Sequence, residues 1–164
     1  MRIRSRSKAP TGPRTYVGQW LLATMLNQSS ERQRLSRMLN GGKSGWNYDE
    51  PAVVEVAFQM AVSRLFPKAV DVREITAFVV DMRSRIHSTE PPDQLETEAL
   101  IRAALGDQDV FISDIQPMRV FNIHVAITAE ATRRFELGKD DIERLILESE
   151  RIAFERGWNP PLAD

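Results

Sequence analysis

Helix-start signals recur along this chain of 164 residues, and they constrain its fold more than any other feature of the sequence. In a capping box, the residue that begins a helix and the residue three positions later each accept a hydrogen bond from the other's backbone N–H. Four patterns of Ser or Asp followed three residues later by Glu or Gln open expected helices, over residues 30–33, 71–74, 93–96 and 140–143. The sequence therefore predicts an all-α fold.

Apolar periodicity places the helices between these signals and the Gly or Pro residues that end them. The expected helices cover about 15–26, 31–39, 50–66, 72–87 and 141–156, with a shorter helix from Asp93 to the stop at Gly106. The helix over 50–66 is apolar on almost every side, which places it in the centre of a core or half-buried against a partner. We expect a compact bundle of about six helices that follows a flexible basic N-terminal arm.

Residues 107–137 fit two patterns. Apolar residues alternate with polar or small ones as in a strand, at Phe121, Ile123, Val125 and Ile127. A helix that starts after Pro117 fits equally well, and a strand here would find a partner only in residues 110–112. We favour the helix, and a short β-hairpin within 109–128 is the alternative.

Charge is distributed unevenly along the chain. Residues 1–45 carry nine basic groups and one acid, Glu31, whereas the remaining residues carry 13 basic and 22 acidic groups. We divide the chain accordingly into a flexible basic arm over 1–14, a basic two-helix segment over 15–45 and an acidic helical body over 46–164, with a linker near 87–92. Such asymmetry is expected when one end of a chain meets a polyanion or an acidic surface.

The arm is the first candidate for nucleic-acid binding. Flexible basic arms follow the phosphate backbone or enter the minor groove of DNA. The arm would contribute five cationic side chains: Arg2, Arg4, Arg6, Lys8 and Arg14. The opposing interpretation is that the arm docks on an acidic protein surface, on its own chain or on a neighbouring subunit.

The second helix is the other candidate. Residues 29–42 (SSERQRLSRMLNGG) resemble the recognition end of a helix-turn-helix, in which a Ser-capped helix presents Arg and Gln to base edges. The resemblance implies that Leu35, Met38 and Leu39 pack inward. The outward residues would be Arg32, Gln33, Arg34 and Arg37, and Lys43 follows in a Gly-rich loop. In that loop, we expect Trp46 and Tyr48 to cover the edge of the core rather than to stack on bases.

The sequence excludes cysteine chemistry and contains no complete motif for a hydrolase, a phosphate loop or a calcium site. The absence of cysteine excludes disulfides and thiolate catalysis. His87 and His124 lack the companions of a metalloprotease or hydrolase motif, residues 41–44 (GGKS) lack the spacing of a phosphate loop, and the acids of 107–114 lack that of an EF-hand. We therefore expect a non-enzymatic regulatory or architectural DNA-binding protein without cofactor or metal, and a homo-oligomeric adaptor is the alternative.

The sequence also leads to expectations about the cellular location and the oligomeric state of the protein. Residues 1–14 are acid-free and rich in Arg and Ser like a transit peptide, but Pro10, Gly12 and Pro13 would break the helix such a peptide needs. No apolar stretch reaches the length of about 18 residues that a membrane span requires. We expect a cytoplasmic protein without membrane contact, and a homodimer, because the apolar helix over 50–66 is hard to cover from within one small chain.

Overall fold

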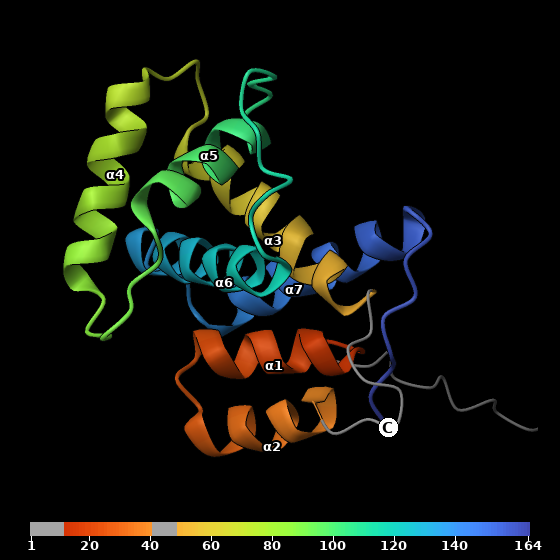
Figure 1. The fold of residues 1–164 in the computed structure, drawn as a ribbon. Helices are drawn as coiled ribbons and strands as arrows, with labels where there is room; N and C mark the ends of the chain where they lie inside the picture. Colours follow the sequence, from red (N-terminus) through yellow and green to blue (C-terminus); the bar gives the residue numbers. More distant parts are fainter. Residues whose placement is uncertain (1–11, 41–48) are drawn as a thin grey trace, which may run out of the picture.

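The structure, a computed structural model, describes residues 12–40 and 49–164, which form seven helices rather than about six (Figure 1). The all-α prediction is confirmed: the described residues contain no strand, only an isolated bridge between Thr15 and Leu162. The alternative hairpin within 109–128 is wrong, because Pro117–Arg134 is a helix and residues 109–116 contain no strand. The helices are α1 (Tyr16–Met25), α2 (Ser29–Asn40), α3 (Glu50–Leu65), α4 (Val72–Arg85), α5 (Gln94–Ala104), α6 (Pro117–Arg134) and α7 (Lys139–Glu155).

Two of the four predicted capping signals start a helix as expected. The Asp71 carboxylate accepts a hydrogen bond from the N–H of Arg73 before α4, and the Asp93 carboxylate accepts one from the N–H of Glu96 before α5. The other two signals were placed wrongly. The turn through Asn27 lets α2 begin at Ser29, and Gly138 caps α7, so the predicted caps Ser30 and Asp140 lie inside the first turns.

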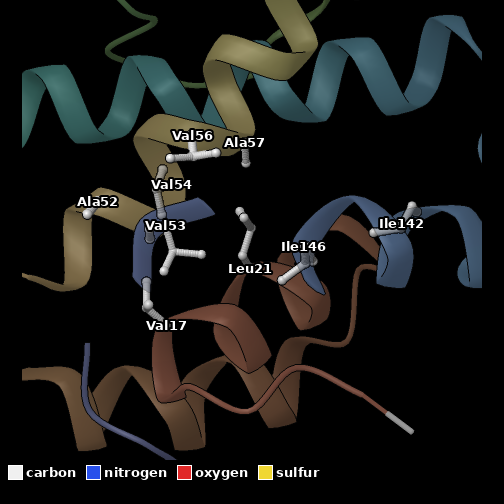
Figure 2. Packing of buried hydrophobic residues seen from close by; sticks show 10 residues of the cluster. Val17, Leu21, Ala52, Val53, Val54, Val56, Ala57, Ile142 and Ile146 are labelled. Atoms are coloured by element: carbon white, nitrogen blue, oxygen red, sulfur yellow. The ribbon is translucent and has the colours of Figure 1, made fainter. Parts of the chain in front are cut away.

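Helix α3 occupies the centre of the fold. It packs against α1, α5, α6 and α7, as Figure 1 shows. In Figure 2, Val53 and Val54 of α3 lie beside Leu21 of α1 and Ile146 of α7. Because helices of the same chain cover its apolar sides, the composition of α3 no longer supports self-association, and our reason for expecting a dimer does not hold.

The core consists of two clusters that α3 joins. The first contains Leu21 of α1 with residues of α3 and α7, and the second contains Phe58 of α3 with Met82, Ile101 and Ile127 of α4, α5 and α6. The basic segment thus shares a core with the acidic body instead of standing apart from it. This shared core fixes the position of the α1–α2 pair, which carries the candidate site.

Candidate nucleic-acid interface

A buried carboxylate fixes the beginning of α1. Glu150 of α7 is 1% exposed, and its Oε1 accepts hydrogen bonds from the N–H of Thr15 at 2.8 Å and from the Thr15 hydroxyl at 2.7 Å. Its Oε2 accepts a third from the N–H of Arg14 at 3.0 Å. The Thr15 oxygen in turn caps the helix by accepting from the N–H of Gly18 at 2.9 Å. Glu150 therefore holds α1, and with it the basic segment, on the acidic body.

Helices α1 and α2 form a hairpin. Figure 1 shows them side by side and running in opposite directions, joined by the turn over 26–28. The Trp20 indole N–H donates to the Ser36 hydroxyl at 2.9 Å, and Leu35 of α2 is fully buried. In a helix-turn-helix, by contrast, the two helices cross at about 90–120°. The hairpin thus departs from the helix-turn-helix arrangement that the sequence resembled.

The outward face of α2 carries the polar residues that the sequence placed there. Arg32, Gln33, Arg34 and Arg37 are all exposed. The inward face is correct for Leu35 and Leu39 but wrong for Met38, which is 47% exposed. Helix α1 covers only one side of α2, so the buried face of α2 is narrow. Met38 lies at the edge of that face.

Arg32 and Arg37 stand apart from most arginines of the described chain. Elsewhere, guanidinium groups contact carboxylates, carbonyl or amide oxygens, or aromatic rings, as in the pairs of Arg102 with Asp107 and of Arg119 with Glu96. Among the arginines of the described residues, only Arg32, Arg37 and Arg73 have a side chain without a hydrogen bond, ion pair or ring contact. Two of these three arginines lie on the same helix, α2, five residues apart.

Arg34 differs from its neighbours on α2. Its Nε and Nη2 donate to the two oxygens of Glu31 at 2.9 and 2.6 Å, three residues earlier on the same helix. The Arg34 hydrogen bond is the largest cause of the lowered pKa of Glu31, so both groups stay charged at neutral pH. The only acid of α2 is thereby paired with Arg34, which leaves Arg32 and Arg37 available.

The structure holds Arg14 more firmly than a flexible arm over 1–14 implies. Its N–H donates to Glu150, its carbonyl oxygen accepts from the N–H of Ala163 at 2.8 Å, and its guanidinium carbon lies 5.7 Å from the centre of the Phe154 ring. Pro13, the residue before Arg14, is buried. The other predicted binding residues Arg2, Arg4, Arg6, Lys8 and Lys43, and the aromatics Trp46 and Tyr48, lie outside the described residues.

The hairpin brings together the two points of the described chain that adjoin the basic stretches of the sequence. Because α1 and α2 run in opposite directions, the start of α1 and the end of α2 lie side by side (Figure 1). Residues 2–11 connect to the first of these points, and residues 41–43 follow the second. Arg37, in the last turn of α2, lies at this shared end.

The remaining ionisable clusters have structural explanations. Burial opposes ionisation of Glu130 in α6, but hydrogen bonds from Arg133, Arg134 and Arg85 outweigh it and lower the pKa of Glu130 to about 2. His124 is stacked on Phe58 with ring centroids 4.1 Å apart, and burial lowers the pKa of His124 to about 4, so its imidazole is neutral at pH 7. These groups stabilise the contacts among α3, α4 and α6.

Sequence reasoning missed two acids, Glu50 and Glu150, which are 7% and 1% exposed. Nothing in the local sequence distinguishes them from surface glutamates, because their burial arises from helices far apart in the chain. The described residues hold no group of three or more side chains placed to bind a metal ion. Nor is any helix within 12–40 and 49–164 long and apolar enough to cross a membrane.

The comparisons with known proteins give no information on the function of this chain. Neither protein-family models, nor curated proteins, nor solved structures give a match to this chain.

Proposed function

We propose that this protein binds duplex DNA through the outward face of α2 together with the basic residues that precede α1. The observation that carries the proposal is the pair of exposed arginines, Arg32 and Arg37, whose guanidinium groups have no partner within the described chain. A guanidinium fork matches phosphate oxygens and the major-groove edge of guanine. Exposed cations that the fold does not use are the groups expected at a surface for a polyanion.

The proposal gives the residues different roles. Gln33 lies between the free arginines in sequence, is exposed and is suited to a bidentate contact with adenine. Arg34 forms an ion pair with Glu31 and would serve as a secondary phosphate contact. The cations Arg2, Arg4, Arg6, Lys8, Arg14 and Lys43 would add phosphate contacts that strengthen binding without reading sequence.

The test compares two changes of the same chemical kind on different faces. Arg73 of α4 is also exposed and free of partners, so R73Q is a matched control for the removal of a solvated cation. We expect the double variant R32Q/R37Q to bind duplex DNA at least about tenfold more weakly than the wild type, since each lost phosphate contact removes favourable counterion release. The R73Q variant should bind within about twofold of the wild type, measured by fluorescence anisotropy on the full chain.

Two results would contradict the proposal. The double variant removes two charges and R73Q removes one, so a loss of binding free energy in R32Q/R37Q no more than twice that in R73Q would mean that net charge alone, and not α2, governs binding. The absence of duplex binding even at low salt would instead favour the alternative, in which the basic residues dock on an acidic protein surface.

A further inference from the structure

A small cavity of about 170 Å³ lies between α1, α2, α3 and α6. Its wall is mainly apolar, and three polar side chains contribute to it. The lining includes Trp20, Leu39 and Phe121 together with Ser36, Glu50 and Asn122.

Glu50 is the unusual member of this lining. It is the first residue of α3 and only 7% exposed, yet no hydrogen bond or ion pair reaches its carboxylate from the described residues. Burial raises the pKa of Glu50 to about 7. Glu150, which is buried to a similar degree, receives three hydrogen bonds. A buried carboxylate is costly without a cation or hydrogen-bond donors, and the described residues supply neither to Glu50.

The aromatic side chains define the kind of cation that fits. The ring centroids of Trp20 and Phe121 lie 5.5 Å apart, and both rings line the cavity. The Trp20 N–H is engaged by Ser36, which leaves the indole ring to contact an occupant. Aromatic rings attract cations and also contact carbon atoms favourably. A carboxylate beside two such rings suits a positive charge that carries an apolar group, and not a hydrated metal ion.

The volume limits the size of the occupant. A protein cavity of about 150 Å³ accommodates benzene, so 170 Å³ admits a ligand of similar size. Met118 and Asn122 are exposed residues of the lining, which opens the cavity to solvent beside α6. We propose that this cavity binds a small organic ammonium ion, with its charge paired to Glu50 and its carbon atoms against Trp20 and Phe121.

The first experiment titrates the full chain with butylammonium and, separately, with butanol as a neutral probe of similar size. We expect saturable shifts of the Trp20 indole N–H in NMR spectra with butylammonium, and at least tenfold weaker binding of butanol. E50Q should weaken butylammonium binding at least tenfold, because it removes the charge and keeps the shape. E55Q, which changes an exposed glutamate of the same helix, should leave binding unchanged.

Three outcomes would overturn the proposal: no saturable binding, equal binding of butanol, or unchanged affinity in E50Q. E50Q removes an unpaired buried charge, so we expect it to fold, which circular dichroism checks. A further variant, K43Q, tests whether a lysine of the chain itself is the cation. If butylammonium binds only after Lys43 is replaced, that lysine is the natural partner of Glu50 and the proposal of a separate ligand is wrong.

Discussion

At the scale of single residues, Glu150 connects the last helix to the two residues that precede α1. Its two oxygens accept three hydrogen bonds, and an added Cβ at Gly18 would lie 2.2 Å from Oε1, so the carboxylate and the glycine fit one another closely. A larger side chain at position 18 would displace the carboxylate from its donors. The positions of Thr15 and Gly18 therefore both depend on the buried carboxylate of Glu150.

The E150Q variant tests this dependence. Replacing one carboxylate oxygen by an NH₂ group places a donor where an acceptor now faces a donor of Arg14 or Thr15, which leaves at least one of these donors without its acceptor. We expect a loss of about 2 kcal/mol in the free energy of unfolding, typical of a buried charged hydrogen bond, measured by urea denaturation. The control E148Q changes a half-exposed glutamate of the same helix that pairs with Arg151 at the surface, and it should cost less than about 1 kcal/mol. Equal stability of both variants would contradict the assigned role.

Glu50 makes stability depend on pH near neutrality. Its pKa is raised from 4.5 to about 7 in the folded protein, so the folded state holds a proton that the unfolded state has released. This contribution to stability is complete below pH 4.5 and is lost as the pH rises through about 7, with a size of at most about 3 kcal/mol. Urea denaturation at pH 5 and pH 8 should show a smaller difference for E50Q than for the wild type. An identical difference in the two proteins would show that Glu50 does not titrate there.

At the scale of helices, Glu130 of α6 ties α4 to its own helix. It contacts Arg85 of α4 as well as Arg133 and Arg134, and Arg134 also reaches Asp81 of α4 at 2.6 Å. Because the pKa of Glu130 falls to about 2 on folding, its contribution to stability is present above pH 4.5 and is lost as the pH falls from there through 2.

The E130Q variant should therefore differ from the wild type mainly at neutral pH. We expect it to lower the thermal midpoint at pH 7 by several degrees, since about 1–3 kcal/mol of a buried charged contact is lost. At pH 2.5, where the wild-type carboxyl is partly protonated, the two midpoints should approach each other. A constant difference between pH 7 and pH 2.5 would mean that the ionised form of Glu130 does not stabilise the fold.

The helices themselves were largely predictable, because local signals determine them. Asp71 and Asp93 cap their helices as expected, and Gly106 and Gly157 follow α5 and α7 with φ of +91° and +89°, a conformation that glycine adopts readily. The predicted helix starts are wrong where a neighbouring turn determines the first residue of the helix, as at Ser30. The prediction that Met38 is buried is wrong because burial on α2 depends on how much of this helix α1 covers.

At the scale of the whole molecule, the all-α class followed from the sequence, but the arrangement around α3 did not. The apolar pattern of α3 was compatible with a dimer interface and with a central position, and only the packing of α1, α5, α6 and α7 distinguishes them. The same holds for the candidate sites. The exposed face of α2 was predictable from spacing, whereas the burial of Glu50 depends on helices that are distant in sequence.

The salt dependence of duplex DNA binding by the full chain tests the central claim most directly. The logarithm of the association constant falls with the logarithm of salt concentration by about 0.9 for each phosphate contact. Five contacts from the basic residues before α1 alone give a slope of about −4.5, and Arg32 and Arg37 make it steeper. The account predicts a slope at least this steep, and a slope near zero, or no binding at low salt, would contradict it.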